Sequence, residues 1–313
     1  MKHEGTPTGT TGTTYRGLFT SEHGPLAVGI LLLEVGAAMT VYISAVVLPR
    51  AMQDLDASDA YPVMLSAASI GAFLALAVAH PLRRAWGAAR LLLLGLLLTM
   101  LGTLVTASAG QAAGYGGGQA VAAFGSGLLG VLGLGVVIES MPIAYRTRLL
   151  ALTSAMWVLP GLIGPPLALL AQTSLGWRGA LLVPLPVLLG ARLLVARAVL
   201  TARSSRRPPH VAARWGMRLL LPLGMAVFVL GSTLHTWWGW PGLALAVVAG
   251  LRLLPAGTVR AAPGPPRHLL ALFLVAGGYF GARSLTTLNA VRAEGLPVAW
   301  ATFSLGASAV LWG

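Results

Sequence analysis

The residue best suited to chemistry in this sequence is a carboxylic acid inside an apolar stretch. Glu34 lies in GILLLEVGAAM, residues 29–39, and is the only charged residue between positions 24 and 50. A carboxylate in hydrocarbon is costly unless it is protonated, paired or facing a cavity. We therefore expect Glu34 to carry a proton or to contact a substrate. The alternative is a protonated side chain that is hydrogen-bonded to a neighbouring helix.

Charged residues also occur in or beside later apolar stretches. Glu139, Arg146 and Arg148 lie in ESMPIAYRTR, residues 139–148. They are expected either to form a salt bridge that gates the cytoplasmic side or to be ordinary interfacial charges. Arg283 lies within another apolar stretch and is followed by Asn289. Arg283 either extends to the membrane interface or contributes a charge to an internal cavity.

Other kinds of site find little support in the sequence. The chain contains no cysteine, which excludes disulfides, thiolate metal sites and a cysteine nucleophile. HTWWGWPG at 235–242 is typical of an interfacial aromatic belt rather than of a metal site. GYGGGQ at 114–119 lacks the Lys-Ser/Thr ending of a phosphate-binding loop, and its glycines are expected to let a membrane helix pack closely. We expect no metal and no cofactor.

The remaining enzymatic alternative is a membrane enzyme that modifies lipids. Such an enzyme would need clustered acids or histidines at a membrane face. The only cluster of acids is Asp54, Asp56 and Asp59, and it contains no histidine. We therefore expect a protein that is not an enzyme.

The elements that position these residues are predicted to be membrane-spanning helices. The sequence is 56% hydrophobic and 9% charged, whereas about a quarter of the residues of a soluble domain are charged. About 20 apolar residues cross a membrane as a helix. Apolar stretches predict spans at 26–48, 62–82, 90–109, 116–138, 149–172, 179–200, 217–234, 238–254 and 269–288. A tenth stretch begins near 298 and stops at Gly313, which indicates a C-terminally truncated chain. The predicted fold is an all-α integral membrane bundle.

The distribution of basic residues predicts orientation and domain boundaries. All but four of the 21 basic residues fall on one side if the N-terminus is cytoplasmic, which follows the positive-inside rule. Arg192 is counted with this cytoplasmic set. The net charge of +13 is then explained by the topology of a multi-pass protein of the cell membrane, not by nucleic-acid binding. The predicted segments are a disordered cytoplasmic tail at 1–25, a six-helix bundle at 26–200, a basic cytoplasmic linker at 201–216, two additional helices at 217–254 and the start of a second bundle at 255–313.

The order of these segments resembles the major facilitator superfamily, in which six spans and a basic linker precede further spans. WVLPGLIGPPLALL at 157–170 resembles the antiporter motif in the fifth helix of that superfamily's drug:proton antiporters, with Pro160, Gly161, Gly164 and Pro165 as the matching residues. GWR at 176–178 is similar to the family's start of the sixth helix. The two additional spans resemble the fourteen-helix branch of these antiporters.

The resemblance implies a secondary transporter that works by alternating access. The implied activity is export of small amphipathic compounds or drugs in exchange for protons, by a monomer in the lipid bilayer. The resemblance also implies that Tyr42, Gln119, Trp157 and Gln172 line a central cavity; the alternative is that each of them packs between helices. Two positions depart from the family pattern, because Arg84 replaces an acid and Gln119 replaces an arginine. The alternative is a truncated, non-transporting remnant of such a transporter.

Overall fold

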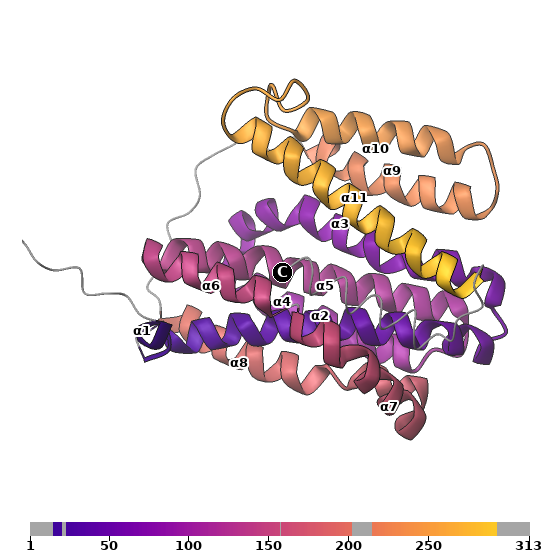
Figure 1. Cartoon of the computed structure of the whole chain (residues 1–313), viewed down its shortest axis with the longest axis horizontal. Coiled ribbons are helices and arrows are strands. Elements are labelled where there is room, and N and C mark those ends of the chain that lie inside the picture. Colours follow the sequence, from indigo (N-terminus) through magenta and orange to yellow (C-terminus); the bar gives the residue numbers. More distant parts are fainter. Residues whose placement is uncertain (1–14, 21–22, 157, 202–214, 293–313) are drawn as a thin grey trace, which may run out of the picture.

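The computed structural model is entirely helical, apart from turns and loops, over the residues that it describes, which are 15–20, 23–156, 158–201 and 215–292 (Figure 1). Its helices are α1 (Tyr15–Thr20), α2 (Gly24–Asp54), η1 (Ser58–Ala60), α3 (Tyr61–Trp86), α4 (Ala88–Ala107), α5 (Ala112–Ser140), α6 (Ile143–Ala155), α7 (Val158–Leu182), α8 (Leu185–Thr201), α9 (Trp215–Thr233), α10 (Gly239–Leu253) and α11 (Pro265–Arg292).

The lengths of these helices confirm the predicted class of fold. Within the described residues, six apolar helical stretches are long enough to cross a membrane. They are Gly24–Asp54, Ser66–Trp86, Ala88–Ala107, Ala112–Val137, Ile143–Gly164 and Pro166–Val195. Two shorter apolar helices, Arg218–Thr233 and Gly239–Leu253, correspond to the two additional predicted spans. The chain therefore folds as an all-α membrane bundle.

The loops of the bundle lie alternately at two ends. One end carries Arg83 and Arg84 at the close of α3 and the arginines of α6, and we call it the basic end. The other end carries Asp54, Asp56 and Asp59 between α2 and α3, and we call it the acidic end. In Figure 1, α1 lies at the basic end, on the left, and the turn between α9 and α10 lies on the right.

Glycines bring the central helices into close contact, with α5 packed between α3 and α4. A Cβ atom added to Gly118 would lie 2.4 Å from Oγ1 of Thr106, and one added to Gly125 would lie 2.5 Å from the backbone nitrogen of Thr99. These distances are shorter than any real carbon contact, so only glycine fits at either position. Small residues allow such close approach in membranes, where no hydrophobic force drives helices together. The expected close packing of the glycine-rich span is confirmed.

Three helices, α6, α7 and α8, cover the region that was predicted as two spans, 149–172 and 179–200. α6 ends at Ala155 and α7 begins at Val158, so the predicted span 149–172 is shared by two helices, and Trp157 between them lies outside the described residues. Pro160 consequently lies in the first turn of α7, where a missing N–H removes no intrahelical hydrogen bond. At Gly176 the backbone takes φ 71°, which favours glycine, and interrupts the helical geometry of α7. A turn at residues 183–184 then separates α7 from α8.

Part of the predicted disordered tail is helical. α1 lies within the segment 1–25, and its Leu18 is fully buried in the apolar cluster at the basic end. Burial of this side chain against the bundle stabilises the short helix.

The two additional helices form a hairpin. A Cβ added to Gly231 would lie 2.3 Å from Cα of Gly239, and one added to Gly242 would lie 2.5 Å from the nitrogen of Phe228. α9 also packs along α3 (Figure 1). Most of the predicted linker at 201–216 lies outside the described residues.

Candidate functional site

Glu34 lines a cavity of about 380 Å³ in the half of the bundle nearer the basic end. The cavity lies between α2, α5, α6 and α8, and most of its lining is leucine, isoleucine, valine, alanine and glycine. Its polar lining residues are Glu34, Ser126 and Thr153. Small-molecule sites have volumes of roughly 300–1,000 Å³ and apolar walls with a few placed polar groups. The cavity around Glu34 matches that description.

The two hydroxyl groups in the cavity are already engaged by their own helices. Oγ of Ser126 donates a hydrogen bond to the carbonyl oxygen of Ala123 at 3.1 Å. Oγ1 of Thr153 donates a hydrogen bond to the carbonyl oxygen of Leu150 at 2.8 Å. Their oxygens therefore remain as acceptors, and Glu34 supplies the only charge among the lining residues. The cavity is chemically suited to an apolar molecule that carries a cationic or hydrogen-bond-donating group.

Two glycines of α2 explain why Glu34 faces this cavity. A Cβ added to Gly29 would lie 2.7 Å from Cγ2 of Val195, and one added to Gly36 would lie 2.6 Å from Cδ2 of Leu188. This face of α2 therefore packs against α8. Successive residues of an α-helix are about 100° apart, so Glu34 lies roughly 140–160° around α2 from these two glycines, on the side away from the contact with α8. That side meets α5 and α6, as the shared lining of the cavity shows.

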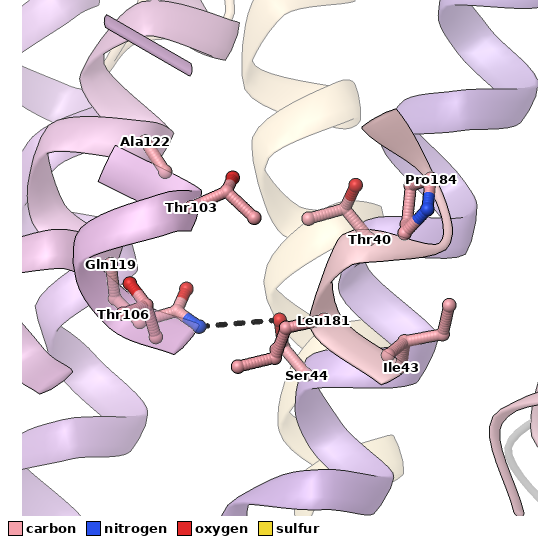
Figure 2. A pocket seen from close by; sticks show the side chains of 9 residues that line it. All are labelled: Thr40, Ile43, Ser44, Thr103, Thr106, Gln119, Ala122, Leu181 and Pro184. Carbon is pink, nitrogen blue, oxygen red and sulfur yellow. Dashed lines mark hydrogen bonds between the residues drawn. The ribbon is translucent and has the colours of Figure 1, made fainter. Parts of the chain in front are cut away.

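Gln119 lies in a separate, smaller pocket (Figure 2). Its Nε2 reaches from α5 to Oγ of Ser44 on α2 at 3.4 Å. Thr40, Thr103 and Thr106 line the same pocket, and each hydroxyl donates to a carbonyl oxygen four residues earlier in its own helix. The pocket volume of about 10 Å³ is close to that of one water molecule. The structure therefore places Gln119 and Glu34 in two different cavities.

Tyr42 and Gly164 join α2 to α7. Tyr42 is 2% exposed. A Cβ added to Gly164 would lie 3.1 Å from Cβ of Tyr42 and 3.3 Å from its Cγ. The glycine of the antiporter-like motif thus makes room for an aromatic residue of the first span. Pro160 and Gly161 are buried near the start of the same helix.

At the basic end, Glu139 forms its ion pair with Arg83 and not, as the sequence led us to expect, with Arg146 or Arg148. Nη2 of Arg83 lies 2.6 Å from Oε1 and 2.5 Å from Oε2 of Glu139. Arg146 instead donates to the carbonyl oxygen of Met141 at 3.2 Å, and the guanidinium of Arg148 lies 5.5 Å from the ring centre of Tyr15. The reason is geometric, because α3 and α5 pack along their lengths and bring their ends together. The arginines of α6 follow a new helix start after Pro142 and face other groups.

Gly135 leaves room for this ion pair. It lies one turn before Glu139 on α5, and an added Cβ would fall 2.9 Å from Nη1 of Arg83. The guanidinium therefore rests on bare backbone while it contacts the carboxylate. The Arg83 side chain is 12% exposed and that of Glu139 is 38% exposed, so solvent reaches the acid more than the base.

A second set of polar contacts closes the acidic end. Nε1 of Trp177 donates to Oδ2 of Asp54 at 2.9 Å, and Nε of Arg50 lies 3.2 Å from the other oxygen of this carboxylate. The guanidinium of Arg178 lies 4.1 Å from the ring centre of Trp177 and donates to the carbonyl oxygen of Ala109 at 3.0 Å. Through Trp177 and Arg178, the GWR stretch therefore connects the start of the sixth span to the ends of the first and third spans. The sequence indicated the motif but not these partners.

Arg192 is a residue whose position the sequence interpretation missed. The charge distribution predicts a cytoplasmic position for Arg192, yet its side chain is only 4% exposed, inside the bundle. Within the described residues, its Nε and Nη1 are buried and have no hydrogen-bond partner. The available signal was its place inside the apolar stretch predicted as the sixth span.

For the other expected site residues, the structure describes fewer contacts or none. Gln172 is half-buried, and its Oε1 has no hydrogen-bond partner among the described residues. Trp157 lies outside the described residues. Arg283 and Asn289 belong to the last part of α11, residues 280–292, where only the backbone is described. Among the described residues, no group of three or more His, Cys, Asp or Glu side chains is arranged to hold a metal ion.

Comparison with known proteins relates the chain to transporters, although no protein-family model matches it. The chain is 24% identical over 257 residues to the Acurin A biosynthesis cluster MFS-type transporter of Aspergillus aculeatus, which covers 79% of this chain and 46% of that protein. It is 31% identical over 156 residues to a probable multidrug-efflux transporter of Mycobacterium tuberculosis in two strains, which covers 50% of this chain and 32% of that protein. The chain thus spans about half or less of the length of these curated relatives.

Proposed function

Because the chain is homologous to MFS-type transporters over most of its length, we propose that it acts in the export of small amphipathic organic molecules across the cell membrane. One observation carries this proposal, namely the cavity of about 380 Å³ that Glu34 lines. Its apolar wall suits the hydrocarbon part of such a molecule. Its single carboxylate suits a cationic group, since an acid in a membrane helix needs a partner, a proton or a cavity.

The same carboxylate supports a proposal of proton exchange. A carboxylate that holds a proton cannot at the same time form an ion pair with a cationic ligand. Binding of the ligand therefore releases the proton, and binding of the proton releases the ligand. If this exchange takes place while the cavity opens alternately to the two sides of the membrane, it couples export to proton entry. Gln119 lies in a separate pocket and carries no charge, so this mechanism assigns the exchange to Glu34 alone.

The ion pair at the basic end supports a gating role. Arg83 and Glu139 connect the ends of α3 and α5, which form two walls of the bundle. By the positive-inside rule, the basic end faces the cytoplasm and the N-terminus is cytoplasmic. Arg83 and Glu139 then hold two helix ends at the cytoplasmic side, and their separation would accompany a change in the access of the cavity. Arg146 and Arg148 are assigned to the neighbouring surface rather than to this pair.

An equilibrium binding measurement tests the cavity as the substrate site. The chain is purified in detergent, and binding of the cationic dye ethidium is followed by fluorescence. The account expects Glu34→Gln to weaken binding by about tenfold or more, which corresponds to about 1.4 kcal/mol. Asp59→Asn is the matched control, because it makes the same chemical change at an exposed acid of the acidic end. Equal binding by Glu34→Gln and the unmodified chain would remove Glu34 from the site.

A further inference from the structure

Three basic residues meet where α3 packs along α9 at the basic end. They are His80 and Arg84 on α3 and Arg218 on α9, and we call them the basic junction. α3 ends at this end of the bundle and α9 begins there, so the last turns of α3 lie beside the first turn of α9. The charges of Arg84 and Arg218 both act on the imidazole of His80. The contact between the two helices therefore brings basic groups together.

The rotation of α3 directs His80 and Arg84 away from α5. Gly71 marks the face of α3 that packs on α5, because a Cβ added there would overlap the carbonyl oxygen of Ala120. At about 100° per residue, His80 lies about 180° around α3 from Gly71, and Arg84 lies about 140° from it. α3 lies between α5 and α9 (Figure 1). His80 and Arg84 therefore belong to the side of α3 that is turned toward α9.

The rotation of α9 directs Arg218 toward α3. Gly224 marks the face of α9 that packs on α10, because a Cβ added there would lie 2.6 Å from the nitrogen of Ala246. Arg218 lies about 120° around α9 from Gly224, and Pro222 lies about 160° from it on the same side. Pro222 is buried and Arg218 is half-buried. Since α3 is the other helix that α9 packs along, this second buried side of α9 meets α3.

The basic junction carries a positive net charge. Of the acids in the described part of the chain, only Glu139 lies at a helix end on the basic side, and its carboxylate binds Arg83. Arg84 and Arg218 stay protonated because the guanidinium does not lose its proton in proteins. Like charges repel more strongly near a protein surface than in bulk water. An anion between α3 and α9 would therefore stabilise their contact.

Exposed leucines continue from the basic junction toward the middle of the membrane. Leu76 lies one turn before His80 on the same face of α3 and is 57% exposed. On α9, Leu219 and Leu223 follow the arginine and are 40% and 54% exposed. A positive group at a helix end next to exposed apolar side chains suits a phospholipid, which has a charged phosphate and hydrocarbon chains. A free phosphate ion would make no use of these leucines.

We propose that the basic junction binds an anionic phospholipid, with its phosphate between Arg84 and Arg218 and an acyl chain over Leu76. Arginine binds phosphate oxygens through paired, charge-assisted hydrogen bonds. Basic sites between membrane helices are known to bind anionic headgroups. The bound lipid reduces the repulsion across the contact and so connects the α9–α10 hairpin to the first bundle. This site does not depend on the proposed export function.

Thermal unfolding of the purified chain in a non-ionic detergent tests the site. Phosphatidylglycerol is the anionic probe, and phosphatidylcholine and inorganic phosphate are added in separate samples at the same concentration. Phosphatidylglycerol is expected to raise the melting temperature by several degrees, whereas the other two change it only slightly. An equal rise with phosphatidylcholine would show that no anionic headgroup is needed, and an equal rise with inorganic phosphate would show a site for free anions. Either result would overturn the proposal.

A matched pair of variants separates a defined site from general charge attraction. Arg218→Gln is expected to remove most of the rise caused by phosphatidylglycerol. Without lipid it should be at least as stable as the unmodified chain, because it relieves repulsion. Arg252→Gln is the control and should keep the rise, since it removes the same charge from the exposed last turn of α10. Equal loss of the rise in both variants, or a lower melting temperature of Arg218→Gln without lipid, would contradict the proposal.

Discussion

The ring of Tyr42 in α2 packs on the bare backbone of Gly164 in α7, so the tyrosine and the glycine fix the distance between the first and fifth spans. A Cβ added to Gly164 would be 3.1 Å from Cβ of Tyr42. The helix that meets Gly164 is thus the first span of the same bundle, α2.

Replacing Gly164 is therefore expected to weaken the folded bundle. Gly164→Ala forces Tyr42 to move by a few tenths of an ångström, and Gly164→Val adds more volume, so we expect losses of about 1–3 kcal/mol that increase in this order. Gly190→Ala is the control, because a Cβ there would meet no atom within 4 Å. Thermal unfolding of the purified variants in detergent measures the effect. Equal stability of Gly164→Val and the unmodified chain would refute the contact.

The close contact between α4 and α5 predicts a stronger effect. Gly125→Ala places a methyl group against the backbone of Thr99, which cannot move without separating the helices. We expect most of the folded protein to be lost, as judged by the monodisperse fraction in size-exclusion chromatography. Gly117→Ala is the matched control in the same helix, since a Cβ at Gly117 would meet no atom within 4 Å. Similar yields for the two variants would contradict the packing described here.

The hydrogen bond between Trp177 and Asp54 is expected to stabilise the acidic end. Trp177→Phe keeps an aromatic ring but removes the donor to the carboxylate, and we expect a loss of about 1–2 kcal/mol in unfolding free energy. Asp54→Asn should cost less in the Trp177→Phe background than alone, because the two changes remove the same bond. Trp240→Phe is the control, since Trp240 is 70% exposed. Additive losses in the double variant would argue against a shared hydrogen bond.

The Arg83–Glu139 pair is expected to matter more for function than for stability. Ion pairs with exposed members contribute about 0.2–1 kcal/mol, and Glu139 is 38% exposed. Glu139→Gln should therefore change the melting temperature only slightly. Transport should nevertheless fall in Glu139→Gln and recover in the exchanged pair Arg83→Glu/Glu139→Arg. Arg148→Gln is the control, because Arg148 lies over Tyr15. A larger loss of transport in Arg148→Gln would restore the pairing expected from the sequence.

Features that depend on composition could be predicted from the sequence. The apolar stretches predicted the membrane helices, and the glycines of residues 114–118 predicted close packing by α5. An acid in an apolar run needs a special environment, which marks Glu34 as a candidate site residue, and the structure places it at a cavity. Each of these inferences uses only the residue and its neighbours in the chain.

Features that depend on how the helices are rotated against one another could not be predicted. The partner of Glu139 is set by the packing of α3 on α5, and the sequence around Glu139 does not reveal which helix packs there. The distribution of basic residues places Arg192 on the cytoplasmic side, whereas its side chain is buried within the bundle. The separation of Gln119 from Glu34 likewise depends on the faces of α2 and α5 that meet.

The most direct test of the central claim is proton-driven ethidium transport in proteoliposomes that contain this chain. A proton gradient is imposed, and dye movement is compared for the unmodified chain, Glu34→Gln and Asp59→Asn. The account predicts gradient-dependent transport by the unmodified chain and by Asp59→Asn, and its loss in Glu34→Gln. Gradient-dependent transport of equal rate in Glu34→Gln, or no transport by the unmodified chain, would contradict the claim.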